Sequence, residues 1–257
     1  MHTLPRTRKL STLATGSLLL TCIGTAHADA SMDAPLDASA WRFQVTPYVW
    51  MTGLKGDLQL SPGLPNIHVS QPFSDVLSDL NAAAFLNGTA RRDRYVLQAD
   101  ASYASVSSTT SLPLGLQARA KVRQSSLTLT GGYQWQPSPQ DSLDAMLGVR
   151  GWHLRSSLQV APLLSVHLSK SFVDPIVALR WRHQWNDRWS SLLYADAGGF
   201  GVGSESTWQV LATVNYQLRD SVYLSAGYRQ LNVDYRNGSQ SLNVRLGGPV
   251  LGATFRF

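Results

Sequence analysis

The sequence contains one cysteine, Cys22, so no disulfide can form within the chain. No segment after residue 40 approaches the run of about 18 apolar residues that a transmembrane helix requires. Lys and Arg form no run or stripe, so the sequence pI of about 9.7 does not indicate a nucleic-acid-binding surface. The sequence shows no metal-ligand spacing and no Gly-rich phosphate loop before a helix, and we expect no metal and no cofactor.

The first 28 residues have the pattern of a secretory signal peptide. A basic region (Arg6, Arg8 and Lys9) precedes a short apolar run at 13–23, and Ala26-His27-Ala28 provides a cleavage site. Removing the three basic residues leaves 19 basic and 16 acidic residues, a net charge of +3, from the 22 and 16 of the whole chain. Residues 29–40 are small, acidic and Pro-containing, and we expect a flexible periplasmic lead before a single domain at 41–257.

The stretch 206–218, STWQVLATVNYQL, alternates between apolar and mostly polar residues. Successive side chains of a strand point to opposite faces. One face therefore carries Trp208, Val210, Ala212, Val214, Tyr216 and Leu218, and the other carries Thr207, Gln209, Leu211, Thr213, Asn215 and Gln217. The two aromatics of the apolar face are separated by about 20 Å along the membrane normal if the strand is tilted. An apolar face with an aromatic near each end is typical of a membrane-spanning strand, since aromatics prefer the interface.

The same alternation recurs along the chain, at 95–103, 127–135, 143–149 and 176–185. Short polar turns (91–94, 137–141, 186–188 and 219–221) alternate with longer links rich in Ser, Gly and Pro (107–115, 161–171, 201–205 and 236–243). This alternation is typical of an outer-membrane barrel. A soluble barrel or sandwich is the alternative, but it would bury its apolar faces and would not need aromatics at both ends of them.

We therefore predict an all-β fold, a single transmembrane antiparallel up-and-down β-barrel of ten strands with both ends in the periplasm. The expected strands are 41–60, 81–91, 94–107, 116–135, 143–159, 172–185, 188–200, 206–218, 222–235 and 244–257. Eight or twelve strands are the alternatives, because residues 53–80 could extend the first strand into a hairpin above the membrane or add two strands. We expect a short helix at 73–80, with Ser74 as its N-cap, on the rim or in the lumen.

Aromatic residues on the apolar faces are predicted to form a girdle at the membrane interfaces. They are Trp41, Tyr95, Tyr103, Tyr133, Trp135, Trp181, Trp185, Trp189, Trp208 and Tyr216. At the C-terminus, Phe255 and Phe257 share the apolar face of the last expected strand. Chains that end in this way resemble substrates of the barrel-assembly machinery, so we interpret these two residues as an assembly signal and that machinery as a partner during biogenesis.

Five segments resemble a family of proteobacterial outer-membrane β-barrel proteins that is loosely grouped with the outer-membrane protein A and W-like small barrels. They are WRFQVTPYVWMTGLKG (41–56), FSDVLSDL (73–80), DAGGFGVGS (196–204), AGYRQLNVDY (226–235) and GPVLGATFRF (248–257). The resemblance runs across nearly all of the chain after the signal peptide and implies the fold and the outer-membrane location, but no activity. This chain has Thr89 where the family often has an acidic residue.

Charged residues on the inward faces form the candidate functional site. They are Asp100, Asp144, Arg150, Asp174, Arg180, Arg182, Asp196, Arg229 and Arg256. A charge inside the barrel needs a partner or water, because burial of an unpaired charge is costly. The set could select solutes or bind a ligand, but an ion-pair network that fills a narrow lumen is the interpretation that we favour.

A hydrolytic site is the remote alternative. An outer-membrane lipid esterase would need a Ser nucleophile, a His base and a group that orients the base. His167 and Ser169, with Asp174 as the third group, come nearest but lie in an expected loop. Asp75 and Asp79 are four residues apart on the expected helix, where a solvated face is the commoner arrangement. His153 and His183 fall on the apolar parity, so they are poor metal ligands.

The sequence thus favours a non-enzymatic outer-membrane protein with a structural or interaction role and a largely filled, charged lumen. Its loops would contact lipopolysaccharide or other envelope components, and outer-membrane lipid would surround it. No nucleic-acid partner is expected, and we expect a monomer. The alternative is a small channel for ions or for small or apolar solutes, and no residue pattern identifies such a solute.

Overall fold

The computed structural model describes residues 40–59, 67–111, 117–161, 164–237 and 240–257. The predicted signal peptide and nearly all of the lead therefore lie outside the described residues. In chain order the elements are β1 (Arg42–Trp50), β2 (Gly53–Gln59), β3 (Ile67–Gln71), α1 (Phe73–Ser78), β4 (Leu80–Arg92), β5 (Tyr95–Ser111), β6 (Gln117–Trp135), β7 (Asp141–Ala161), β8 (Leu164–Gln184), β9 (Trp189–Gly198), β10 (Ser206–Arg219), β11 (Val222–Asn237) and β12 (Gln240–Arg256).

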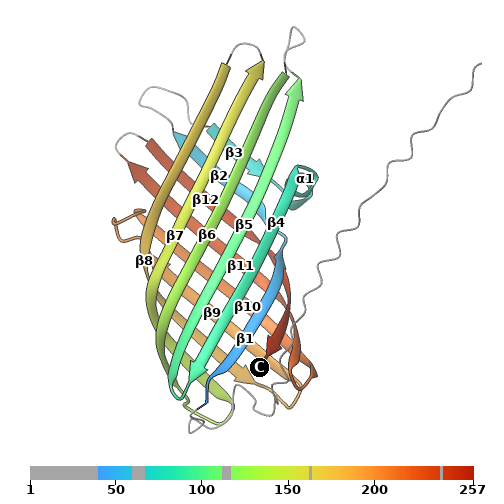
Figure 1. The fold of residues 1–257 in the computed structure, drawn as a ribbon, viewed down its shortest axis with the longest axis vertical. Coiled ribbons are helices and arrows are strands. Elements are labelled where there is room, and N and C mark those ends of the chain that lie inside the picture. The colour runs from blue at the N-terminus through green and yellow to red at the C-terminus, as the bar shows by residue number, and fades with distance from the viewer. Residues whose placement is uncertain (1–39, 60–66, 112–116, 162–163, 238–239) are drawn as a thin grey trace, which may run out of the picture.

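The strands form a closed antiparallel barrel (Figure 1). Each strand from β4 to β12 pairs with its chain neighbour, and β1 closes the wall between β12 and β4. This wall has ten strands, and β2 and β3 are additional, so the prediction of ten strands is confirmed. Among the described residues no helix is long and apolar enough to cross a bilayer.

The first expected strand is broken in two. β12 pairs with β1 from Val250 to Arg256 and with β2 from Ser241 to Gly247. β1 ends at Trp50, and the two residues before β2 are not in a strand. β2 then forms a hairpin with β3. β2 therefore extends the first strand and β3 pairs back beside it, which is the hairpin alternative and leaves the wall at ten strands.

The short helix is present as α1, but its predicted cap is wrong. The N-cap residue is Pro72, and Ser74 lies inside the helix, where its hydroxyl donates a hydrogen bond to the Asp75 carboxylate at 3.1 Å. Pro is suited to a helix start because its φ angle already matches and its missing N–H would have had no partner there. No residue of α1 is buried, so the helix connects β3 to β4 on the outer side of the wall and does not plug the lumen (Figure 1).

The two ends of the barrel differ in how far their strands extend. At the short-turn end, β4, β6, β8 and β10 are joined to their successors by connections of two to five residues, and the chain ends there. At the opposite end, which we call the long-strand end, β5–β8 rise beyond the other strands (Figure 1). The expected link at 161–171 is mostly strand, because 164–171 continues β8 in register with β7. Leu164, Val166 and Leu168 alternate there with Ser165, His167 and Ser169, a signal for a strand that the interpretation as a link left unused.

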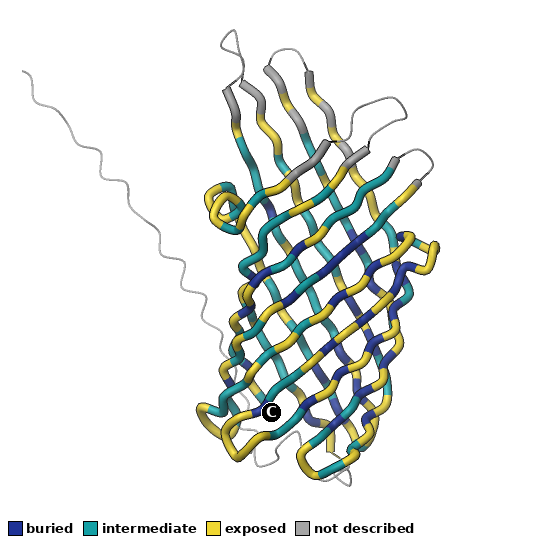
Figure 2. Tube along the Cα trace, turned by 180° about the vertical axis from the view of Figure 1, so that it is seen from behind, coloured by how far each residue is buried: buried dark blue, intermediate teal, exposed yellow. Residues whose placement is uncertain are grey.

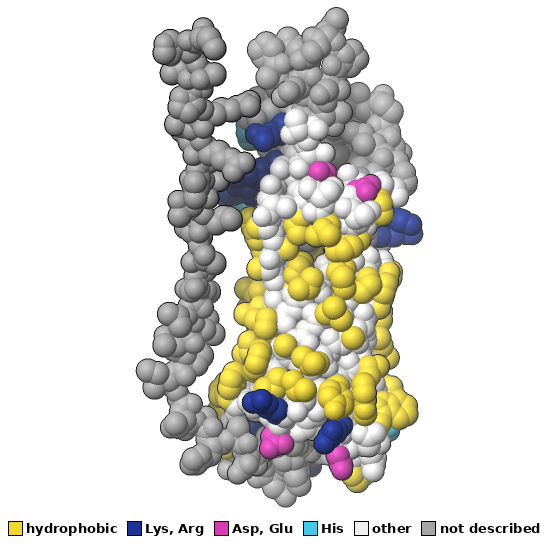
Figure 3. All heavy atoms as spheres, turned by 90° about the vertical axis from the view of Figure 1, so that its right-hand side faces the viewer, with side chains coloured by type: hydrophobic (Ala, Val, Ile, Leu, Met, Phe, Trp, Pro, Cys, Tyr) yellow, Lys and Arg dark blue, Asp and Glu magenta, His cyan; other side chains and the backbone are white. Residues whose placement is uncertain are grey.

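Side chains alternate between the inside and the outside of the barrel along each strand (Figure 2). In β10, Trp208, Val210 and Ala212 are exposed, while Thr207 and Gln209 are buried. Exposed Leu and Val side chains continue this pattern around the wall, as at Leu97, Leu129, Leu147 and Leu179. They form an outer hydrophobic belt, and Figure 3 shows charged side chains beyond it at both ends. The barrel is thus apolar outside at mid-height, as predicted.

The predicted girdle residues lie on the outside, but they are unevenly distributed. All ten are exposed except Tyr216, which is partly exposed and whose ring lies 4.9 Å from that of Trp189. Eight of them lie near the short-turn end, at the ends of β4–β10 or before β1: Trp41, Tyr95, Tyr133, Trp135, Trp181, Trp185, Trp189 and Tyr216. Tyr103 and Trp208 lie farther toward the long-strand end, so the aromatics gather mainly at one edge of the belt.

Candidate functional site

The structure places the nine predicted lumen charges on the inner face of the wall. Seven of them are at most 6% exposed: Asp144, Arg150, Asp174, Arg180, Arg182, Asp196 and Arg229. Asp100 and Arg256 are partly exposed. They form several separate groups.

Asp144 on β7 is the centre of the group nearest the short-turn end. Arg91 of β4 donates two hydrogen bonds to its carboxylate, at 2.8 and 3.3 Å, and Arg180 of β8 donates one at 2.7 Å. Arg180 also reaches Thr89 and Gln98, at 3.2 and 2.8 Å, on the far side of the lumen. The network therefore ties β4 and β5 to β7 and β8 through the interior. Thr89 accepts from an arginine where the resembling family often has a carboxylate.

Arg229 on β11 is the centre of a second group. Its guanidinium donates to Asp100 of β5 at 3.0 Å, to Gln209 of β10 at 2.6 and 2.9 Å, and to the Tyr48 hydroxyl. Tyr48 in turn donates to Asp100 at 3.1 Å. The guanidinium also lies 4.7 Å from the ring centroid of Trp50, within cation–π range. A charge on β11 is thus neutralised by a carboxylate on β5, across the barrel interior.

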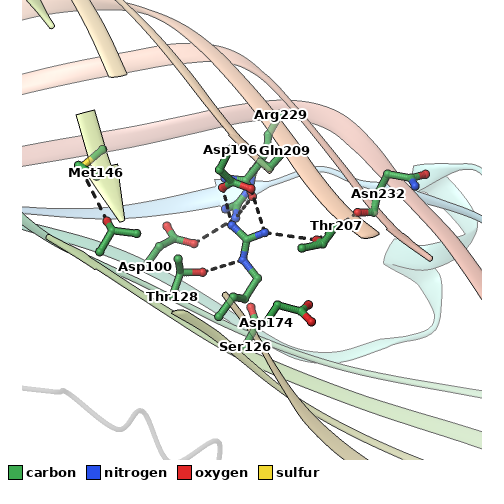
Figure 4. Close-up of polar contacts among 12 residues, drawn as sticks. Asp100, Ser126, Thr128, Met146, Asp174, Asp196, Thr207, Gln209, Arg229 and Asn232 are labelled. Carbon is green, nitrogen blue, oxygen red and sulfur yellow. Dashed lines mark hydrogen bonds and ion pairs between the residues drawn. The ribbon is translucent and has the colours of Figure 1, made fainter. Parts of the chain in front are cut away.

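Arg150 on β7 makes the third group with Asp196 on β9. The contact is bidentate, with one N–O distance of 3.1 Å, and Thr128 accepts a further hydrogen bond from the Nε of Arg150 at 2.8 Å. Thr207 lies at 3.5 Å. Figure 4 shows Asp196, Thr128 and Thr207 pointing toward one another in the barrel interior. Planar bidentate contacts of this kind hold both partners in one geometry.

Asp174 forms hydrogen bonds to the backbone of a loop and to an indole ring. Its carboxylate accepts hydrogen bonds from the backbone N–H of Ser204 at 2.7 Å and from the indole of Trp152 at 3.1 Å. Ser204 belongs to the connection from β9 to β10, where Gly203 leaves no room for a side chain because an added Cβ would lie 2.4 Å from the Val173 carbonyl oxygen. Asp174 therefore fixes this glycine-rich loop against β8.

The remaining two arginines lie near the short-turn end. Arg182 is buried on β8, and Arg256 stacks on Tyr223, with 3.8 Å between its guanidinium carbon and the ring centroid. Arg91 was predicted at the boundary of the strand 81–91 and the turn 91–94 and was not among the inward charges, but it is the penultimate residue of β4 and 1% exposed. Its alternation with Thr89 could have indicated this.

Two apolar clusters also lie inside the wall, and they were not predicted from the sequence. Toward the long-strand end a cluster contains Trp50, Trp152, Leu231, Val233, Leu246 and Val250. A second cluster contains Val96, Met146, Ile176, Ala178 and Tyr194. The sequence analysis emphasised the charged and polar residues of the inward faces, yet these large apolar side chains share that parity. Their positions on the polar parity were a signal that could have been read.

A cavity of about 110 Å³ lies between the Asp144 and Arg229 groups. Two of its lining residues, Arg180 and Gln44, each have one buried polar atom, Nη2 and Oε1, without a hydrogen-bond partner among the described residues. Thr213, Asn215 and Asp100 line it as well. Buried polar atoms beside a cavity of this size are typical sites for bound water.

The residues proposed for a hydrolytic site do not come together in the structure. His167 and Ser169 are exposed, whereas Asp174 lies on the opposite parity of β8 and is buried. His153 instead contacts Ser171, with 2.6 Å between Nδ1 and Oγ, on the outer face. Asp75 is exposed and Asp79 partly exposed, at either end of α1. In the part of the chain that the structure describes, no three His, Cys, Asp or Glu residues could hold a metal ion together.

No family model matches the sequence, and no curated protein matches it. The fold does resemble that of solved structures. The outer-membrane protease OmpT from Escherichia coli superposes with a TM-score of 0.54 at 9% identity, over 86% of this chain and 100% of OmpT. The translocator domain of the autotransporter NalP from Neisseria meningitidis gives a TM-score of 0.47 at 12% identity, over 86% of this chain and 90% of that one. The match to OmpT shows that the chain has the fold of outer-membrane β-barrels. At 9% identity the similarity concerns the fold alone.

Proposed function

We propose that the protein is an integral outer-membrane barrel with a structural or interaction role and a lumen that is closed to solutes. The observation that supports this best is the presence of three Arg–Asp groups and two apolar clusters inside the wall. A conducting pore needs a continuous hydrated path, and ten-stranded barrels are close in size to the eight-stranded ones that side chains fill.

The outer hydrophobic belt supports membrane insertion. Leu147 and Leu179 are more than half exposed, on strands whose inner faces carry Asp144 and Arg180. A soluble barrel with these faces would expose its apolar side to water and bury its charges. In a bilayer the arrangement is favourable, because lipid covers the belt and the closed backbone pairing leaves no unpaired edge in the wall. Outer-membrane barrels have their short turns in the periplasm, so we infer that the short-turn end lies in the periplasm and the long-strand end outside the cell.

The first experiment tests membrane insertion. The protein, purified in detergent, should migrate differently on a gel before and after boiling, with a β-rich far-UV spectrum in the unboiled state. A soluble protein whose migration does not depend on boiling would contradict the proposal.

The second experiment tests the closed lumen. In planar bilayers the wild-type barrel should give small or erratic currents. Arg229→Ala combined with Trp50→Ala removes the cation and the ring it stacks on, so this variant should conduct more than wild type. Large steady currents through the wild-type barrel would favour the alternative, a small channel.

A catalytic role has little support. The candidate residues His167, Ser169 and Asp174 lie on different faces of β8. The similarity to a protease is a similarity of fold, and function depends on the site and not on the fold. We therefore infer a non-enzymatic protein.

A further inference from the structure

The halves of β6, β7 and β8 toward the long-strand end are rich in basic residues and have no carboxylate. Segments 101–139 and 145–173 contain six Lys and Arg residues and no Asp or Glu. One of the six, Arg150, is paired with Asp196 in the interior. The other five are Arg119, Lys121, Arg123, Arg155 and Lys170. These five lie in the halves of β6, β7 and β8 toward the long-strand end, so this region carries a positive charge that no acidic residue of the two segments offsets.

Four of these cations share the outer face of the sheet, so the interpretation of the sequence that Lys and Arg form no stripe was wrong for β6. Arg119, Lys121 and Arg123 have the parity of the exposed Leu127 and Leu129 on β6. Arg155 of β7 lies directly opposite Arg123 in the register. Like charges that face each other across antiparallel strands destabilise a sheet. An anion bound between the two guanidinium groups would remove this cost.

The cations lie just beyond the hydrophobic belt. Leu127 is exposed in the belt, and Arg123 is four residues farther along β6 toward the long-strand end. Four residues of a tilted strand rise about 10 Å along the membrane normal. That rise reaches from the edge of the hydrocarbon into the headgroup layer.

Polar side chains surround the cations and complete a binding surface. A shallow groove of about 280 Å³ is lined by Lys121, Arg123, Arg155, Ser156, Ser157, His167 and Ser169. Guanidinium groups bind phosphate oxygens through paired, charge-assisted hydrogen bonds, and serine hydroxyls can donate to the remaining oxygens. The groove thus combines the two kinds of donor that a phosphate group accepts.

We propose that Arg119, Lys121, Arg123 and Arg155 form a binding surface for the phosphorylated headgroups of outer-leaflet lipid. This inference rests on the proposed membrane location, which puts the surface at headgroup height. We name the four residues the basic surface. The lipid is bound from the side, along the outer wall, and the lumen is not involved.

The experiment measures binding of bisphosphorylated lipid A to the purified barrel in neutral maltoside micelles, with dephosphorylated lipid A as the comparison ligand. Wild type should bind the phosphorylated form more tightly, and higher ionic strength should weaken binding because salt screens exposed charges. The double variant Arg123→Glu with Arg155→Glu should lose about tenfold or more in affinity. Arg123→Gln with Arg155→Gln should lose less.

A matched control exists on another part of the wall. Lys55 of β2 and Arg245 of β12 are also exposed cations that lie directly opposite each other. Asp57 lies two residues from Lys55 on β2, so this pair has a carboxylate nearby. The double variant Lys55→Glu with Arg245→Glu makes the same change in net charge. It should alter the affinity for lipid A by no more than about twofold, because a single exposed charge pair contributes little energy.

Several results would overturn the proposal. They are equal binding of the phosphorylated and dephosphorylated lipids, an equal loss in both glutamate variants, or binding of a soluble polyanion such as inorganic polyphosphate without binding of lipid A. Heat-modifiable migration is recorded for every variant, so that only folded barrels are compared. A wild-type chain that is not heat-modifiable contradicts the proposed membrane location, whereas a folded barrel that does not discriminate contradicts only the basic surface.

Discussion

Phe43 and Phe257 exchange both of their backbone hydrogen bonds, at 3.0 and 2.9 Å, and so close the barrel at its short-turn end. The two residues are far apart in sequence, and their pairing joins the first strand to the last. Removal of Phe257 should therefore weaken closure in two ways, because the pair of hydrogen bonds and the terminal ring are lost together. We expect the folded, heat-modifiable fraction to fall several-fold, both in refolding into lipid vesicles and in the cell.

Phe257→Ala separates the two effects. This variant keeps the backbone pair with Phe43 but loses the ring that we predict to be part of the assembly signal. Refolding into vesicles should be close to that of wild type, whereas the folded fraction in the cell should fall. If the alanine variant folds normally in the cell, the ring is not required for assembly and that prediction is wrong.

The buried pair of Arg229 and Asp100 should be sensitive to loss of one partner. Asp100→Asn leaves the guanidinium without its carboxylate in the barrel interior, and we expect a loss of about 3–5 kcal/mol in the free energy of unfolding. Arg229→Met alone should also destabilise. The double variant should lose less than the sum of the two, because no unpaired charge is left. Urea unfolding of the barrel in vesicles measures the cycle, and additivity would show that the two residues do not interact.

Asp174 should control one loop and not the whole barrel. Asp174→Ala removes the acceptor of the Ser204 N–H, so amides of residues 199–205 should exchange with solvent faster. Amides in the centre of β6 and β7 should keep their protection. Asp220→Ala, in an exposed turn, is the control and should change neither region. Faster exchange throughout the barrel would show that Asp174 supports the wall as well.

The wall could be predicted from the sequence because its signal is local. Alternation at 206–218 assigned each of those residues to a face without any knowledge of its neighbours. The extension of β8 at 164–171 was not predicted, although Leu164, Val166 and Leu168 alternate there with Ser165, His167 and Ser169, because the whole of 161–171 was interpreted as a link. Pairing with β7 is what makes that segment a strand, and pairing is not visible in a single segment.

The interior was harder to predict for a different reason. Parity placed Asp144 and Arg180 on inner faces, but it could not show that Arg91 also reaches Asp144, because that contact depends on how strands three apart are staggered around the barrel. Trp50 and Trp152 share the polar parity of their strands. The emphasis on charged residues of that parity left out the apolar cluster to which these two residues belong.

The assignment of faces can be tested by a pair of substitutions one residue apart. Ala212 is exposed in the belt and lies opposite Leu193 and Tyr228, whereas Thr213 lines the interior cavity and donates a hydrogen bond to Asn215 at 3.2 Å. Ala212→Arg places a charge against hydrocarbon near the middle of the bilayer and should cost about 2–4 kcal/mol. Thr213→Arg places it beside polar groups and should cost less, provided that the side chain fits the cavity. Depth in the membrane is nearly the same for both, so only the face differs.

Folding yield and urea unfolding in lipid vesicles measure the two variants side by side. The comparison is decisive because the same side chain is added to adjacent positions of one strand. Greater damage from Thr213→Arg would mean that the true register differs by one residue, which would move every inward residue of β10 to the outside. If neither substitution affects folding in lipid, hydrocarbon does not cover Ala212, and β10 does not face the bilayer at this depth.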